Sequence, residues 1–293
     1  MNLTHGIVRR NQLTKQELEE IKALQEVCET HDTISLKLNW SMLRDRADEH
    51  DESFLYYAEG KLAGFLALYY FGRDEMEASG MVHPEQRRRG IYTELVKTAQ
   101  EECIKRNISK LIFICPGHSA SGHAFCEQNN SVYSFSEYYM ERNGDCLVDA
   151  PNIQDFVIRK AYTSDAASLS LLNQEAFDMS AEAADQFAEF SLEKGNTLVA
   201  DWNGEIIGKL NIREKESHAF LYGFAVAAKH RGKGYGRIML LHSIAYSQTM
   251  MGKMNQSLEV AAANSTALGL YVSCGFKEQN KIDYYEMKQG KHF

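Results

Sequence analysis

Residues 231–236 read Arg231-Gly232-Lys233-Gly234-Tyr235-Gly236, and this stretch decides how the rest of the chain is interpreted. It follows a predicted strand, Phe220–Val226, and precedes a helical pattern of apolar residues. The three glycines allow a tight bend and let the backbone approach a ligand with no Cβ in the way. Free N–H groups and the dipole at a helix N-terminus attract anions, and Lys233 and Arg237 add positive charge. The stretch therefore predicts a phosphate-binding turn.

The turn has two alternative interpretations. A glycine-rich turn can be a plain strand-to-helix connector, because such loops are weak signals by themselves. A dinucleotide-binding fold needs the spacing G-x-G-x-x-G and an acidic residue about twenty positions on. Arg237 and Met239 leave that pattern without its third glycine, so the dinucleotide interpretation is excluded.

An internal repeat relates the two halves of the chain. Gly60–Gly64 and Gly204–Gly208 share the pattern G-x-x-x-G, and the same spacing of 144 residues separates Arg87 from Arg231 and Gly90 from Gly234. The chain is predicted to be a tandem duplication with domains 1–145 and 146–293. Strands alternate with helices in both copies, which predicts a mixed α/β sheet in each. Residues 143–154, which contain Gly144 and Pro151, are interpreted as the linker.

The strand ending Phe224-Ala225-Val226, followed by R-x-x-G-x-G, resembles the coenzyme A signature of the GNAT N-acetyltransferases. The segment Asn264–Phe276 reads N-x-x-A-x-x-L-Y-x-x-x-G-F and resembles the second hallmark of that family. The resemblance implies two tandem GNAT-like domains, each a mostly antiparallel twisted sheet flanked by helices. In each sheet a splayed strand pair would admit the coenzyme. It also implies that acetyl-CoA is the co-substrate and that no metal is required.

The resemblance assigns roles to residues of the second copy. Backbone groups of Phe224, Ala225 and Val226 would pair with the pantetheine, and a backbone N–H there would stabilise the oxyanion. The turn, Arg237 and Asn264 would contact the coenzyme, although Asn264 also suits a plain helix N-cap. Tyr271 occupies the position of the general acid near the sulfur, and its alternative role is core packing.

Glu259 is the candidate general base. It lies five residues before Asn264, a spacing that resembles the ribosomal-protein N-terminal acetyltransferases, in which a glutamate there accepts the proton. Between Leu258 and Val260 it would point to the opposite face of its strand. A solvent-facing or ion-paired glutamate, with a water chain as the base, is the alternative. His218 is a weaker candidate.

The first copy keeps part of the turn as Arg87-Arg88-Arg89-Gly90-Ile91-Tyr92 after Val82. These residues predict an anion site that could hold coenzyme A, although Tyr92 replaces the last glycine. Aligning Ser119 with Asn264 puts Cys126 at the tyrosine position and Ile114 at the glutamate position. The first copy is therefore expected to be degenerate, with catalysis in the second. The resemblance to mycothiol synthase, a tandem family member whose C-terminal copy is active, supports this division.

Cys115, His118, His123 and Cys126 have side chains and spacings that could suit zinc. They fall across a predicted strand-to-helix junction at which the family holds no metal. We therefore expect packed and polar residues there and no bound zinc.

The overall composition narrows the possible partners. The net charge is −8, with 17 basic and 24 acidic residues in 1–150 against 15 and 16 in 151–293, so there is no basic footprint for nucleic acid. No apolar run is long enough for a membrane span, and six scattered cysteines are typical of a reduced, cytoplasmic protein. The expected acceptor is a small-molecule amine or a protein N-terminus, and the chain would be a monomer or a dimer. The alternative function is a coenzyme A-binding sensor without turnover.

Overall fold

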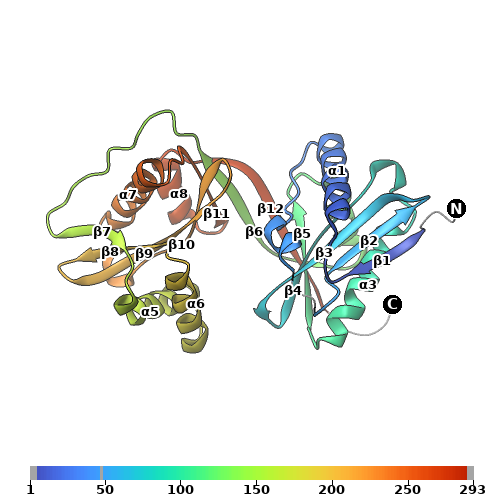
Figure 1. The fold of residues 1–293 in the computed structure, drawn as a ribbon, viewed down its shortest axis with the longest axis horizontal. Coiled ribbons are helices and arrows are strands. Elements are labelled where there is room, and N and C mark those ends of the chain that lie inside the picture. Colours follow the sequence, from blue (N-terminus) through green and yellow to red (C-terminus); the bar gives the residue numbers. More distant parts are fainter. Residues whose placement is uncertain (1–4, 47–48, 289–293) are drawn as a thin grey trace. The chain divides into compact units, whose positions relative to one another are not determined.

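The computed structural model describes residues 5–46 and 49–288, which divide into two compact units. The first unit comprises residues 1–137 and 280–293, and the second comprises residues 138–279. Each unit contains a sheet with helices on both faces (Figure 1). Among the described residues, every helix is too short or too polar to cross a lipid bilayer.

The first unit is built on seven strands in the order β1-β2-β3-β4-β5-β12-β6. Their bounds are Gly6–Arg10, Ser53–Ala58, Lys61–Arg73, Glu75–Val82, Lys110–Pro116, Lys277–Lys288 and Val132–Arg142. β4 and β5 pair in parallel. The pairs β1–β2, β2–β3 and β3–β4 are antiparallel. The predicted mixed, mostly antiparallel sheet is therefore confirmed for this half.

Alternate side chains of β3 separate the two faces of the first sheet. Phe65, Ala67 and Tyr69 pack under helix α1 (Lys15–Asp32), together with Ile21 and Leu24. Leu66 and Leu68 pack on the other face, under helix α3 (Ile91–Lys105). Both faces are consequently filled by apolar core. The remaining helices are the short α2 (Trp40–Arg44) and α4 (Ala120–Gln128).

The second unit repeats this plan in the strand order β7-β8-β9-β10-β11, with the end of β6 beside β11. The strands are Phe156–Lys160, Thr197–Trp202, Glu205–Glu214, His218–Val226 and Asn255–Ala261. One face is covered by α5 (Ala166–Phe177) and α6 (Ala181–Glu193), and the other by α7 (Tyr235–Met250) and α8 (Ser265–Ser273) (Figure 1). The larger apolar core lies on the α7 side.

The last strand of the chain completes the first unit. Residues 282–288 of β12 pair antiparallel with residues 110–116 of β5, and Ile282 and Tyr284 enter the core under α1. The sequence repeat suggests a simple division near residue 145, but the second copy's final strand lies in the first unit's sheet. The predicted linker, residues 143–154, contains no helix or strand.

Candidate active site

Both units contain a pair of parallel strands that separate partway along their length. The β10–β11 ladder runs from His218↔Asn255 to Leu221↔Leu258 and then stops, although both strands continue. The β4–β5 ladder stops at Ala78↔Phe113 in the same way. The predicted splayed strand pair is confirmed in both copies. The backbone groups beyond each ladder are free of cross-strand partners in that pair.

A β-bulge in β10 distinguishes the second copy from the first. The β9–β10 register jumps between Tyr222↔Asn211 and Ala225↔Lys209, which takes Gly223 and Phe224 out of the ladder. Gly223 adopts a φ of +59°, a conformation that favours glycine. In contrast, β4 pairs with β3 without a break from Met76 to Val82. The bulge overlaps the start of the backbone segment predicted to hold the thioester, since Phe224 belongs to both.

The turn after β10 has the geometry of an anion site. Gly232 and Gly234 have φ values of +73° and +85°, and Gly234 caps α7 without any side-chain hydrogen bond to the first turn. The Arg231 Nε donates to the Val226 carbonyl at 2.8 Å, which fixes the loop. Lys233 is exposed, whereas Arg237 Nη1 donates to the Ser273 carbonyl at 2.9 Å. The first-turn N–H groups of α7 are thus left open to a ligand.

The first unit repeats the turn with one difference in its arginine. Arg87 Nε donates to the Val82 carbonyl at 3.0 Å, and Gly90 caps α3 at a φ of +82°. The two terminal nitrogens of Arg87 also bind both oxygens of Asp32, at 2.9 and 2.7 Å. The charge of Arg87 is therefore paired within the protein, whereas Arg88 and Arg89 are exposed. Ile91 is buried at the start of α3.

A cavity of about 310 Å³ lies between the separated strands of the first unit. Its wall includes residues of the turn, both strand ends and α4, among them Gly80, Tyr92, Phe113, Cys115 and Cys126. This position between β4 and β5 corresponds to the splayed pair of the second copy. The first unit thus has a cavity that extends to the turn containing Arg88.

In each copy an aromatic ring packs between the strand before the turn and the helix after it. The ring comes from the strand in the second copy and from the helix in the first. In the second copy Phe224 of β10 lies beside Gly236 of α7, where a Cβ would sit 3.7 Å from the ring. In the first copy the strand residue is Gly80 and the helix residue is Tyr92, whose ring would lie 3.0 Å from a Cβ at Gly80. Tyr92 thus compensates for the missing strand ring.

Tyr271 of α8 lies in the core beside Phe224. Its side chain is 8% exposed, and its ring centroid is 6.4 Å from that of Phe224 and 6.0 Å from that of Phe276. Burial raises the pKa of Tyr271 to about 12, so the phenol keeps its proton at neutral pH. The hydroxyl has no hydrogen-bond partner among the described residues. A protonated phenol beside the splayed strands can donate a proton.

Glu259 lies near the C-terminal end of β11, and Asn264 lies beyond that end. Leu258 and Val260 pack in the core under α7, so Glu259 points to the face covered by α5 and α6, where it is exposed. Burial raises the pKa of Tyr139, and the negative charge of Glu259 raises it further. Asn264 caps α8, since its Oδ1 accepts from the Ala267 N–H at 3.0 Å. Ser119 caps α4 in the same way, which supports their alignment.

Two of the four residues with zinc-like spacing, His123 and Cys115, contact other groups of the protein. His123 contacts the Tyr285 hydroxyl at 2.8 Å and the Gly117 carbonyl at 3.1 Å, while Cys115 and Cys126 are buried in the cavity wall. The hydrogen bond with Cys126, together with burial, raises the pKa of the Cys115 thiol, which disfavours a metal-binding thiolate. No group of three or more potential metal ligands occurs within 5–46 and 49–288.

Lys209 of β9 is a residue that the sequence patterns did not single out. It is 1% exposed and lies beneath α5 and α6, with Nζ 5.4 Å from the Phe177 ring centroid and 4.8 Å from that of Phe187. The repeat places Phe65 at the corresponding position of the first copy. The sequence feature that could have identified Lys209 is the presence of a lysine within the apolar run of β9. The acidic residues of the adjoining helices, Asp178, Glu182, Asp185 and Glu189, are all exposed.

A family model described as the acetyltransferase (GNAT) family matches residues 16–129 and again residues 163–276. Two solved structures have the same fold over almost the whole chain. A GCN5-related N-acetyltransferase from Sphaerobacter thermophilus has a TM-score of 0.84 at 18% identity, covering 100% of this chain and 98% of its own. A tandem GNAT protein from the clavulanic acid biosynthesis pathway has a TM-score of 0.76 at 16% identity, with 98% and 99% covered.

Curated relatives match over shorter segments. The spermidine N(1)-acetyltransferase of Vibrio cholerae is 27% identical over 110 residues, which are 37% of this chain and 63% of that protein. The ribosomal protein bS18 alanine N-acetyltransferase of Salmonella typhimurium is 38% identical over 73 residues, 25% of this chain and 49% of that protein. The chain therefore spans about half to two thirds of the length of these relatives.

Proposed function

Because the chain belongs to the acetyltransferase (GNAT) family and carries two copies of its domain, we propose that it is an N-acetyltransferase that uses acetyl-CoA. The acetyl group passes to a primary amine by direct attack in a ternary complex. The transfer takes place in the C-terminal copy. Relatives whose names include spermidine and a ribosomal protein alanine make a small amine or a protein N-terminus the candidate acceptor.

The observation that carries this proposal is the difference between the two sheets on the face opposite the phosphate-binding helix. Under α1, the first copy fills that face with Phe65, Ala67 and Tyr69. Under α5 and α6, the second copy has Lys209 and Asn211 instead. An acceptor amine that meets the thioester between the splayed strands needs polar side chains on this face. This requirement favours the second copy.

The second copy also supplies the groups for proton transfer. Glu259 takes a proton from the ammonium, and the neutral amine then attacks the thioester carbon. A backbone N–H in Phe224–Val226 stabilises the oxyanion while the C–S bond breaks. Tyr271 gives its proton to the leaving thiolate, so the products are the acetylated amine and free coenzyme A. Solvent then restores both side chains.

The first copy is proposed to bind coenzyme A without turnover. Its cavity, Arg88 and Arg89 provide space and positive charge. Ile114 and Cys126 stand where the second copy has Glu259 and Tyr271, and Cys126 is buried in apolar core. The first copy therefore lacks both proton-transfer groups.

A thiol-release assay with acetyl-CoA over a panel of amines tests the proposal, with calorimetry of acetyl-CoA binding in parallel. We expect thiol release that depends on one class of amine, with one acetylated product per thiol. Binding of acetyl-CoA without release for any amine would instead identify a coenzyme A sensor.

A further inference from the structure

Lys209 is a buried cation without an anionic partner. Its side chain is 1% exposed, and no carboxylate of the described residues lies within 4.0 Å of its Nζ. Its Nζ lies over the rings of Phe177 and Phe187. Burial lowers the pKa of Lys209 to about 8, so the ammonium form still dominates at pH 7. A charge removed from water in this way costs free energy unless something pairs with it.

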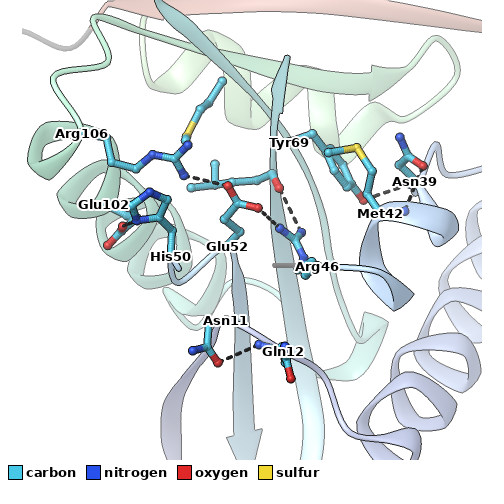
Figure 2. A network of polar contacts seen from close by, with 12 residues as sticks. Asn11, Gln12, Asn39, Met42, Arg46, His50, Glu52, Tyr69, Glu102 and Arg106 are labelled. Carbon is cyan, nitrogen blue, oxygen red and sulfur yellow. Dashed lines mark hydrogen bonds and ion pairs between the residues drawn. The ribbon is translucent and has the colours of Figure 1, made fainter. Parts of the chain in front are cut away.

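The first unit shows how the same chain treats a buried cation that has only a structural role. Arg46 is also buried, but its guanidinium reaches the Glu52 carboxylate and the Leu68 carbonyl. Arg106 binds the other oxygen of Glu52 at 2.7 Å, and Figure 2 shows both guanidiniums meeting at this carboxylate. Lys209 has no such arrangement. Its position therefore calls for a partner from outside the chain.

Lys209 lies next to the proposed site of acyl transfer. A Cβ built on Gly223, the bulge residue, would be 3.6 Å from Lys209 Nζ and 3.1 Å from Asn211 Nδ2. The ammonium thus adjoins the backbone just before Phe224, on the face covered by α5 and α6. Asn211 cannot neutralise it, because an amide side chain carries no negative charge, and its Oδ1 accepts a hydrogen bond from Thr197 Oγ1 at 2.8 Å. An anion held by Lys209 would lie beside the reacting amine.

Resting on the function proposed above, we propose that Lys209 forms a carboxylate subsite, and that the acceptor is an amine that carries a carboxylate, such as an amino acid. A single negative charge matches a single buried cation. Lys209 is itself 1% exposed, and low exposure to water strengthens an ion pair. The same ammonium disfavours a polycationic acceptor, since two like charges would share a site of low dielectric constant. Polyamines are accordingly predicted to be poor acceptors.

The test compares matched pairs of acceptors, each an amino acid and its carboxamide, in the thiol-release assay with acetyl-CoA. The wild type should prefer the carboxylate member by roughly 10- to 100-fold in kcat/KM, as expected for a charge-assisted contact. Lys209→Met should bring the two members within about threefold. Lys215→Met is the matched control, because Lys215 is an exposed lysine over another aromatic ring, 6.0 Å from the Phe220 centroid. This control should keep the preference.

Calorimetry with N-acetyl amino acids and their amides, in the presence of coenzyme A, gives a readout that needs no turnover. Tighter binding of the carboxylates, lost in Lys209→Met, would support the subsite even if no amine were acetylated, and the proposed function would then be the part that fails. Equal binding of carboxylate and amide, or a preference that survives Lys209→Met, overturns the proposal. A Lys209 dependence seen only with succinyl-CoA as donor would overturn it too, because the carboxylate would then belong to the acyl group.

Discussion

Burial acts on Tyr271 and Lys209 in opposite directions, and both effects bear on function. It raises the pKa of the Tyr271 phenol to about 12 and lowers the pKa of the Lys209 ammonium to about 8. In each case the low dielectric constant favours the neutral form. The phenol is kept as a proton donor, whereas the ammonium remains charged at neutral pH at a cost to stability.

The cost of Lys209 should be visible in the pH dependence of stability. Its pKa is about 8 when folded and near its ordinary value of 10.5 when unfolded, so the unfolded chain binds more protons between these values. The destabilisation is fully present below about pH 8 and disappears as the pH rises toward 10.5, a change of about 3 kcal/mol.

Denaturant unfolding of the wild type and of Lys209→Met between pH 7 and 10.5 measures this effect. We expect the variant to be the more stable protein at pH 7 and its advantage to shrink as the pH rises. A difference between the two proteins that stays constant across this range would show that Lys209 is not desolvated.

At the scale of elements, the local patterns of the sequence predict most strands and the phosphate-binding turn. The predicted strand Phe220–Val226, for example, agrees with the observed β10, His218–Val226, to within two residues. The turn was predicted from its glycines, and Gly232 and Gly234 adopt the positive φ that favours this residue. Such signals are contained within a few neighbouring residues.

Features that depend on distant partners could not be predicted in this way. The bulge in β10 depends on how β9 pairs with it, and the Arg87–Asp32 ion pair joins residues 55 positions apart. Phe224 of a strand supplies the aromatic ring in the second copy and Tyr92 of a helix supplies it in the first, and this difference depends on packing between the strand and the helix. Lys209 could have been found by aligning it with Phe65, because a charge replaces an apolar core residue there.

The unbroken pairing of β4 predicts that Gly80 cannot be replaced. A Cβ at Gly80 would lie 2.6 Å from the Phe65 carbonyl oxygen, a backbone atom that cannot move away cheaply. Gly80→Ala should therefore destabilise the first unit by about 2 kcal/mol or more.

Gly269→Ala is the matched control, since a Cβ at that helical position meets nothing within 4 Å. It should stabilise the protein by about 0.5–1 kcal/mol. Thermal or denaturant unfolding of both variants decides the matter. Similar stabilities for the two would mean that β4 has room at Gly80 and that its pairing differs from the one described.

At the scale of the whole molecule, a repeat in sequence does not coincide with a division in space. The second copy ends in β12, yet residues 280–293 belong to the first compact unit. Pattern analysis predicts the strand but not its partner, because strand pairing is decided by the complete sheet. The stability of the first unit therefore depends on residues at the far end of the chain.

Two buried isoleucines test this dependence. Ile282 of β12 packs under α1, whereas Ile207 of β9 packs under α7. Replacing either by alanine should cost about 2–5 kcal/mol. Amide hydrogen exchange should show that Ile282→Ala exposes β5 and that Ile207→Ala exposes β10. Loss of protection in β10 but not in β5 for Ile282→Ala would contradict the assignment of β12 to the first unit.

The proposal that the C-terminal copy performs the transfer is tested most directly by thiol release from Tyr271→Phe. Loss of the proton donor should lower kcat about 100-fold while acetyl-CoA binding, measured by calorimetry, stays within about twofold of the wild type. Tyr246→Phe, which alters a partly buried tyrosine packed against the same core, serves as the control and should retain the wild-type rate. A wild-type kcat for Tyr271→Phe would contradict the account and exclude this residue as the general acid.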